Sequence, residues 1–181
     1  GSFTNNGVVN LSSSYAIQLD QGSFNFTNTG IINATANYVI WINGATIGTF
    51  LNSGTINGST SGYTLRFTSG SIGTFTNSGS ISYAVSTISL DGSLTIGTLN
   101  NAQGASSSAL KFIELSASGL PTNYNIIINS PSDFGKLDWA SPSGSTTFGI
   151  YSGSTVAAGR YTSVITGLSA GSFTGARSGT Y

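Results

Sequence analysis

The segment Phe26-Thr-Asn-Thr-Gly-Ile-Ile-Asn33 decides the fold, because it recurs along the chain. The other copies are Phe3-Thr-Asn-Asn-Gly-Val-Val-Asn10, Phe50-Leu-Asn-Ser-Gly-Thr-Ile-Asn57, Phe75-Thr-Asn-Ser-Gly-Ser-Ile-Ser82 and a degenerate copy that begins at Leu99-Asn-Asn101. The intervals between copies are 23, 24, 25 and 24 residues. A repeat of this length is typical of proteins that stack copies of one supersecondary unit.

Two further elements repeat in phase with the first. One comprises Ile17-Gln-Leu19, Ile40-Trp-Ile42, Leu65-Arg-Phe67, Ile88-Ser-Leu90 and, more loosely, Leu110-Lys-Phe112; the other comprises Ile47-Gly-Thr-Phe50, Ile72-Gly-Thr-Phe75 and Ile96-Gly-Thr-Leu99. All three elements alternate apolar with small or polar residues, as strands with one buried face do. The sequence therefore predicts an all-β fold, a right-handed parallel β-helix (β-solenoid) with three short strands in each coil of about 24 residues.

The register of the repeat predicts columns of stacked side chains. We expect inward columns at Phe3, Phe26, Phe50, Phe75 and Leu99, at Val9, Ile32, Ile56 and Ile81, and at Ile17, Ile40, Leu65 and Ile88. We also expect a hydrogen-bonded amide ladder at Asn5, Asn28, Asn52, Asn77 and Asn101. The glycines two residues after each Asn are expected at bends with positive φ, namely Gly7, Gly30, Gly54 and Gly79.

The repeat spacing breaks after about Leu115, and all three prolines lie in the last third of the chain. Strand-like runs remain there, separated by Pro, Gly and Ser turns. Because an open solenoid end exposes unpaired strand edges, it needs a cap. We therefore divide the chain into β-helix repeats over residues 1–119 and a β-rich C-terminal capping segment over residues 120–181.

Composition excludes several classes of function. The chain has five Lys and Arg against five Asp and Glu, with no His, Cys or Met. A neutral chain so poor in cations is a poor nucleic-acid binder. The missing residue types exclude catalytic triads with His, Cys/His zinc sites and haem ligation by His, Cys or Met, and we expect no cofactor and no metal. No apolar run is long enough to span a membrane as a helix, so we expect no membrane insertion.

Carboxylates are the remaining acid–base groups. Asp20 and Asp91 occupy similar turn positions, but three coils separate them, about 14 Å at the usual strand spacing, which is too far for a glycosidase pair. Asp133 and Asp138 flank Lys136 in a segment that is interpreted as a solvated charge cluster. No catalytic residue is assigned.

The outward positions of the second element offer a candidate ligand surface. If Ile40 and Ile42 point inward, Trp41 points outward, with Gln18 and Arg66 in the same column. An exposed Trp with flanking amide and guanidinium groups suits contact with a glycan or with a cell-surface protein. The alternative is that a turn or a neighbouring chain covers Trp41.

The repeats and the tail together resemble passenger domains of bacterial type V autotransporters. The tail carries the more specific likeness, in Leu120-Pro-Thr-Asn-Tyr-Asn-Ile-Ile-Ile-Asn-Ser-Pro-Ser-Asp-Phe-Gly-Lys-Leu137 and Phe148-Gly-Ile-Tyr-Ser-Gly-Ser-Thr-Val-Ala-Ala-Gly-Arg-Tyr161. The resemblance implies export through the outer membrane and display on the bacterial cell surface, as a piece of a longer rod. It also implies an autochaperone-like role for the C-terminal segment.

Three functional hypotheses follow. The first is a non-catalytic adhesin or fibre stalk, which the regular coils and the zero net charge favour. The second is a glycan-active β-helix enzyme, which would need carboxylates or basic residues clustered on one face. The third is a module that self-associates between chains through a flat polar face.

Overall fold

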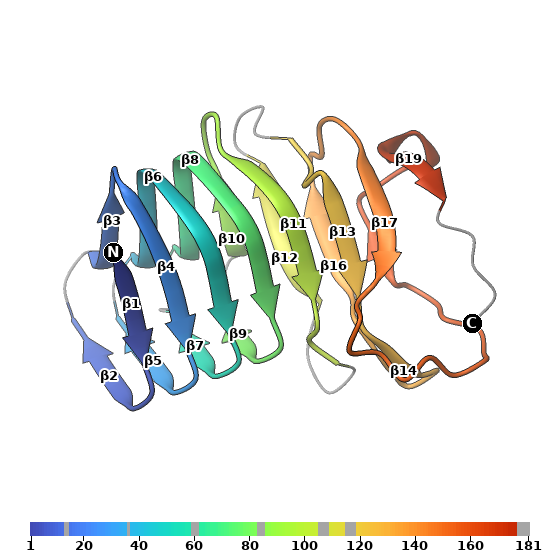
Figure 1. Ribbon diagram of the computed structural model, residues 1–181, viewed down its shortest axis with the longest axis horizontal. Coiled ribbons are helices and arrows are strands. Elements are labelled where there is room, and N and C mark those ends of the chain that lie inside the picture. The colour runs from blue at the N-terminus through green and yellow to red at the C-terminus, as the bar shows by residue number, and fades with distance from the viewer. Residues whose placement is uncertain are drawn as a thin grey trace.

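The computed structural model describes residues 1–12, 15–35, 37–58, 62–82, 86–104, 109–114 and 119–176. Figure 1 shows the strands stacked side by side along a rod, from the N-terminus to the C-terminal end. The strands are β1 (Ser2–Asn5), β2 (Val8–Leu11), β3 (Tyr15–Asp20), β4 (Ser23–Asn28), β5 (Ile31–Ala34), β6 (Tyr38–Asn52), β7 (Thr55–Asn57), β8 (Tyr63–Asn77), β9 (Ser80–Ser82), β10 (Ser86–Leu90), β11 (Thr95–Asn101), β12 (Leu110–Glu114), β13 (Asn123–Ile126), β14 (Ile128–Ser130), β15 (Asp133–Phe134), β16 (Leu137–Ala140), β17 (Thr146–Ile150), β18 (Ile165–Thr166) and β19 (Phe173–Ala176). One short 3-10 turn, η1 (Ala170–Ser172), precedes β19.

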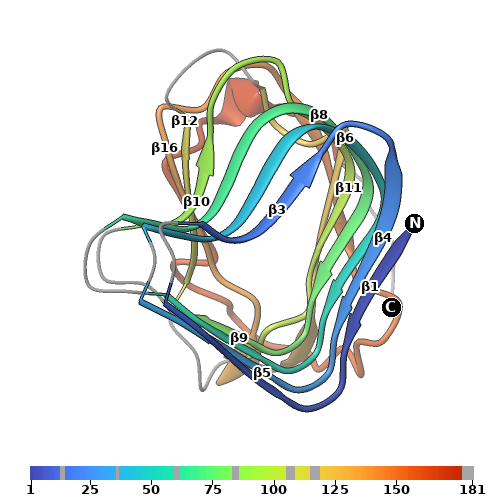
Figure 2. The same cartoon turned by 90° about the vertical axis from the view of Figure 1, so that its left-hand side faces the viewer.

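The strands form a parallel β-solenoid of about six turns, as the repeat predicted. The front face contains β1, β4, the second halves of β6 and β8, β11, β13, β17 and β19, and the back face contains β3, the first halves of β6 and β8, β10, β12, β16 and β18. The lower face contains β2, β5, β7 and β9. Seen from the N-terminal end in Figure 2, the chain runs clockwise as it recedes, which makes the coil right-handed.

The three predicted apolar columns form the core. Phe26, Phe50 and Phe75 are fully buried, and their rings stack with centroids 4.4 and 4.6 Å apart. The register carries the same column on through Leu99 to Tyr124 and Phe148. The back-face column of Ile40, Leu65 and Ile88 is also fully buried, as are Ile32 and Ile56 of the lower face. Each face therefore contributes a continuous apolar stripe to one shared core.

The register at β12 differs from the sequence alignment. The repeat aligned Leu110-Lys-Phe112 with Ile88-Ser-Leu90, whereas the structure pairs Ile88 with Phe112 and Ser89 with Ile113, a shift of two residues. The inward aromatic group explains the shift, because Phe112 lies in the Ile88 column and stacks on the fully buried Trp139 at 4.3 Å. The register of β12 is thus set by the need to bury the Phe112 ring in the core and not by the similarity of its sequence to the repeat.

The conserved spacing of Gly7, Gly30, Gly54 and Gly79 has a different cause from the one expected. Their φ angles are not positive; the glycines with positive φ that bend the chain between the back and front faces are Gly22, Gly44, Gly70 and Gly92. A Cβ on Gly30 would lie 2.0 Å from the carbonyl oxygen of Gly7, and one on Gly54 would lie 2.0 Å from that of Gly30. The column is glycine because neighbouring coils approach too closely there for any side chain.

An amide ladder runs through the buried corner between the front and lower faces. The Nδ2 of Asn5 donates to the Oδ1 of Asn28 (2.8 Å), and Asn28 and Asn52 each donate in the same way to the next Asn (2.7 Å). Asn77 then donates to the Oε1 of Gln103 (2.6 Å). Asn28, Asn52 and Asn77 are fully buried, so the ladder satisfies amides that would otherwise be costly to bury.

Asn101 does not continue this ladder, in contrast to the expectation. Its backbone pairs with that of Asn77, but Gln103 takes the hydrogen bond from the Asn77 amide. The Nδ2 of Asn101 instead donates to the carbonyl oxygen of Lys136 (2.8 Å) and to the hydroxyl of Tyr124 (3.3 Å). Gln103 lies two residues after Asn101, beyond the last recognisable repeat copy, and its longer side chain extends to the position where the next ladder amide would lie.

The sheets continue beyond residue 119. Strand β13 pairs in parallel with β11, β16 with β12 and β17 with β13, so the front and back faces extend into the C-terminal segment. The lower face changes instead, because its four strands end at Ser82 and the antiparallel pair β14–β15 follows later. The boundary drawn at 119/120 marks the end of the recognisable repeat within a continuous solenoid.

We predict that Phe50→Ala lowers the free energy of unfolding by about 3–5 kcal/mol, because it opens a cavity between two stacked rings. Urea denaturation followed by circular dichroism measures the change. The exposed neighbour Thr49 supplies the control, since Thr49→Ala should alter stability by no more than about 0.5 kcal/mol. Equal effects of the two substitutions would contradict the core position of Phe50.

The glycine column gives a second matched pair. Gly54→Ala should lower stability by about 1–3 kcal/mol or more, because the added methyl group meets the Gly30 carbonyl and the coils must move apart. Gly7→Ala should be nearly neutral, because a Cβ at Gly7 has no atom within 4 Å. Denaturation midpoints of the two variants test this, and a midpoint of Gly54→Ala at or above that of Gly7→Ala would overturn the close-approach explanation.

Candidate functional site

The column that contains Trp41 lies on the outer side of the back face. The register places Gln18 of β3, Trp41 of β6 and Arg66 of β8 side by side in successive coils. Gln18 is exposed, and Trp41 and Arg66 are partly exposed. The next position in the column, Ser89, is fully buried, so the accessible row ends at Arg66. The structure thus brings together the three residues of the predicted ligand surface.

Arg66 is held by two partners on neighbouring coils. One guanidinium nitrogen forms a salt bridge with Asp91 (2.9 Å), and the other donates to the hydroxyl of Tyr38 (2.7 Å), whose ring also lies beneath the guanidinium at 4.9 Å. Burial alone would lower the pKa of Arg66, but the hydrogen bond to Asp91 and the attraction of Tyr38 and Asp91 outweigh it and raise the pKa. The Arg66 guanidinium group therefore stays protonated, and the carboxylate of Asp91 balances its charge.

Trp41 is fixed by a chain of polar groups that leads back to Gln18. The indole Nε1 donates to the hydroxyl of Thr68 (3.1 Å), which in turn donates to the Oδ1 of Asn43 (3.0 Å). The amide of Asn43 donates to Asp20 (3.1 Å), and the amide of Gln18 donates to the other oxygen of that carboxylate. The indole ring is thus held in place at one edge, while part of its surface stays open to solvent.

The sequence predicted the outward column of Gln18, Trp41 and Arg66, but it did not predict the residues that hold these side chains in place. In the sequence, Asp20 and Asp91 are recognisable only as similar turn positions. In the structure, Asp91 pairs with Arg66, and Asp20 accepts hydrogen bonds from two side-chain amides. The repeat already contained a signal, because each carboxylate follows the strand-ending Leu19 or Leu90 and therefore lies beside the outward row of the adjacent coil. Such cross-coil pairing depends on side-chain reach, which the repeat alone does not specify.

The acidic groups do not gather into a site in the described part of the chain. Asp133 accepts a hydrogen bond from Asn129 (3.1 Å), and Asp138 accepts one from Thr166 (2.8 Å). Among the described residues, no group of three or more His, Cys, Asp or Glu side chains is placed to hold a metal ion. Within those residues, no helix is long and apolar enough to cross a membrane.

A second amide ladder, on the lower face, was not predicted. The Nδ2 of Asn33 donates to the Oδ1 of Asn10 (2.8 Å), and that of Asn57 donates to the Oδ1 of Asn33 (2.7 Å). Ser82 takes the fourth position and donates to Asn57 (3.0 Å). The signal was the last residue of each repeat copy, which is Asn in the first three copies and Ser in the fourth.

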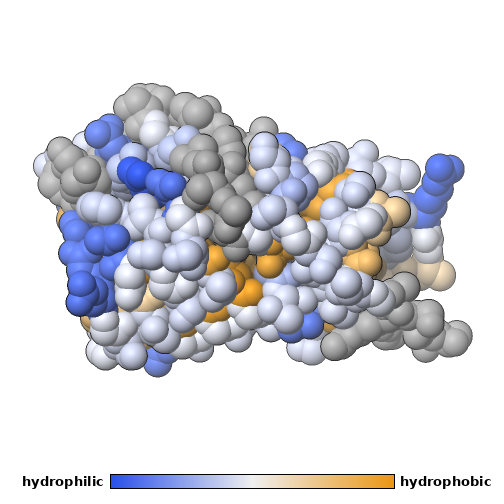
Figure 3. Space-filling view, turned by 90° about the horizontal axis from the view of Figure 1, so that it is seen from above, coloured by the Kyte–Doolittle hydropathy of each residue, from blue (hydrophilic) through white to orange (hydrophobic). Residues whose placement is uncertain are grey.

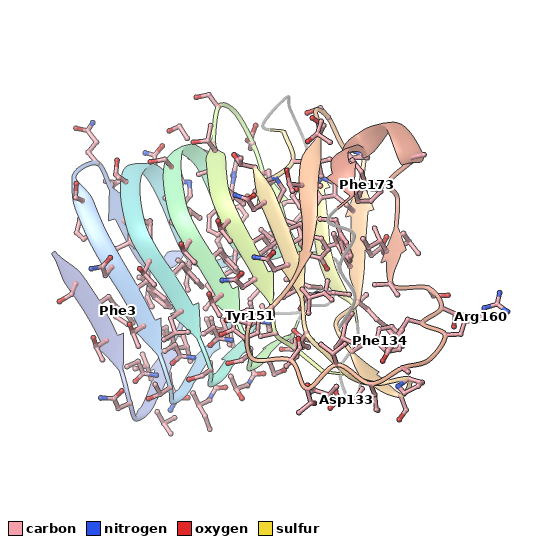
Figure 4. The ribbon with its side chains drawn as sticks, turned by 45° about the vertical axis from the view of Figure 1, so that its right-hand side comes forward. Phe3, Asp133, Phe134, Tyr151, Arg160 and Phe173 are labelled. Atoms are coloured by element: carbon pink, nitrogen blue, oxygen red, sulfur yellow. The ribbon has the colours of Figure 1, made fainter. Side chains whose placement is uncertain are left out.

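The C-terminal end of the rod has an apolar cavity of about 630 Å³. It lies among side chains of the last two coils and of the segment 151–164, which connects β17 to β18. The chief lining residues are Ile126, Phe148, Tyr161, Val164, Ile165 and Phe173. Figure 4 shows Phe173 and Phe134 at this end, with Arg160 pointing away from the rod. Phe148 contacts Phe173 edge to face at 6.2 Å, and Phe134 contacts Tyr161 in the same way at 5.3 Å. This end of the rod therefore presents an apolar hollow.

The face of the rod seen from above (Figure 3) has weak polarity over much of its described area, with strongly hydrophilic residues toward the N-terminal end. Figure 3, seen from above, shows mainly neutral to mildly hydrophilic residues, with hydrophobic patches midway along the rod and toward the C-terminal end. This agrees with the charged content of only 6%. Recognition on such a surface must depend on hydrogen bonds and aromatic contact more than on long-range charge.

We predict that the Arg66–Asp91 pair contributes little to stability, because the two side chains are 26% and 34% exposed. A double-mutant cycle with Arg66→Ala and Asp91→Ala should give a coupling energy of about 0.2–1 kcal/mol. Repeating the cycle in about 1 M salt should reduce this value through screening. A coupling energy that stayed the same at high salt would show that the pair acts as a buried structural element.

Comparison of the chain with protein-family models, with curated proteins and with solved structures gave no significant match. The parallel β-solenoid of about six turns and the geometry of its outward faces are the features that bear on function.

Proposed function

We propose that the chain is part of a bacterial type V autotransporter passenger, exported through the outer membrane and displayed on the cell surface as an adhesin or fibre stalk. The repeat, the solenoid architecture and the likeness of residues 120–161 to passenger ends support this assignment. The C-terminal segment would assist folding and cap the rod. Its parallel pairing with the repeat coils supports such a role, because a folded end can template the neighbouring coil.

The observation that carries an adhesive function is the fixed, partly exposed Trp41 beside Arg66 and Gln18. A Trp face with its edge anchored by Thr68 offers an apolar platform at little entropic cost on binding. Arg66 is neutralised by Asp91, so the surface suits a neutral polar partner such as a glycan, or a cell-surface protein. We infer binding without catalysis, since the described carboxylates on this face are engaged with Gln18, Asn43 and Arg66.

Self-association is the alternative that a specific observation favours. The outer edges of β18 and β19 carry no partner strand among the described residues, and the adjoining cavity is apolar. Unpaired edges of this kind template pairing with another chain. A mass that rises with protein concentration would support this alternative, whereas a constant monomer mass favours the adhesin or stalk. A glycan-active β-helix enzyme remains the third hypothesis, and release of new sugar ends distinguishes it.

The test is binding of the purified chain to a broad glycan panel, alongside Trp41→Ala. Binding that falls at least about tenfold in the variant, without release of sugar ends, is the expected result. Tyr151→Ala provides a matched control, because Tyr151 is a partly exposed aromatic residue of the C-terminal segment (Figure 4). Release of sugar ends into the supernatant would contradict the non-catalytic proposal, and equal binding by Trp41→Ala would remove this surface from it.

A further inference from the structure

The second amide ladder, at Asn10, Asn33 and Asn57, lines a groove on the lower face, and no residue of the Trp41 surface is among the described residues that line this groove. The groove encloses about 420 Å³ and crosses three successive coils. Each of the first two coils contributes an Asn, an apolar residue and a hydroxyl residue in that order, and the third contributes Asn57 and Gly58. The coils stack along the rod (Figure 1), so a groove that crosses three successive coils runs parallel to the rod axis.

The ladder leaves hydrogen-bond donors unused. A side-chain amide has two N–H donors, and the ladder uses one from Asn33 and one from Asn57. The remaining N–H of each residue, and the amide nitrogen of the exposed Asn10, have no acceptor among the described residues. The buried ladder differs in this respect, because Asn28 and Asn52 also donate to backbone carbonyl groups. The lower-face ladder therefore presents a row of free N–H groups.

The groove has the chemistry of a carbohydrate site. Its free N–H groups recur once per coil, about 4.8 Å apart, so they suit an extended polymer with an oxygen acceptor in each unit. Leu11, which is partly exposed, supplies apolar contact beside them, and Ser12 and Thr35 supply hydroxyl groups. None of the described lining residues is charged, so these residues offer nothing to balance an anionic or a cationic ligand.

We propose that this groove binds a neutral, extended oligosaccharide laid along the rod axis. The free N–H groups of Asn10, Asn33 and Asn57 would donate to sugar oxygens in successive units, and Leu11 would contact a less polar sugar face. This site is independent of Trp41, and it assigns a role to the Asn that ends each of the first three repeat copies. The rod would thus hold a polysaccharide along its length on one face and present the Trp41 surface on another.

Oligomers of β-1,4-linked glucose and of N-acetylglucosamine, from one sugar upward, are the probes, with titration calorimetry as the measurement. Affinity should rise with chain length and level off near about three sugars, since the groove spans two coil spacings of about 4.8 Å. Oligomers of galacturonic acid should bind no more tightly than the neutral series. A single-sugar affinity equal to that of the longer oligomers would contradict an extended site.

Thr35→Trp tests the location of the site, because it fills the groove from an exposed position and leaves the ladder amides intact. It should weaken binding at least about tenfold, whereas Thr49→Trp, at another exposed Thr that lies on the front face, should leave binding unchanged. Ser12→Trp obstructs the same groove from the first coil and replaces Thr35→Trp if that variant does not fold.

Three results would overturn the proposal. The first is no binding of either neutral series by the folded wild-type chain. The second is unchanged binding by a folded Thr35→Trp or Ser12→Trp variant. The third is loss of this binding in Trp41→Ala, which would assign the oligosaccharide to the back face and leave the adhesin proposal standing.

Discussion

The close spacing of parallel coils is the constraint on which this structure depends. Neighbouring strands of a sheet lie about 4.8 Å apart, so most residues of the paired strands lie directly above their equivalents in the next coil. Only side chains that tolerate a copy of themselves at that distance can form a column. Phenylalanine rings satisfy the constraint by stacking, asparagine amides by donating to one another, and glycine by having no side chain where the carbonyl of Gly30 faces Gly54.

The same constraint shapes the outer faces. Outward residues also recur at coil spacing, so any polar group repeated in the sequence becomes a row on the surface. Asn10, Asn33 and Asn57 form such a row, whereas Gln18, Trp41 and Arg66 form a row of three unlike residues. A row of identical groups suits a polymer with repeating units, and a row of unlike groups suits a ligand that contacts a single patch. The two surfaces are therefore chemically distinct although one repeat produces both.

The repeat predicted the fold because its period of two and its phase directly encode which residues face inward. It predicted the Phe and Ile columns for the same reason, since these depend only on register within the repeat. It failed at Leu110-Lys-Phe112, at Asn101 and at the Gly column, where the outcome depends on volume and on distances between coils. The sequence did not predict the contacts that hold Arg66 and Trp41 in place. Asp91 and Thr68 make these contacts from a neighbouring coil, and the repeat pattern does not specify how far a side chain extends across coils.

The two amide ladders differ in direction. In the buried ladder each amide donates toward the C-terminal end, from Asn5 to Asn28 and onward, whereas on the lower face Asn57 donates to Asn33 and Asn33 to Asn10. The amide dipoles of the two rows therefore oppose each other along the axis. Within one row, reversing a single amide would set donor against donor on one side and acceptor against acceptor on the other. Each row must consequently adopt one orientation as a whole, so the first coils to fold fix the polarity that later coils inherit.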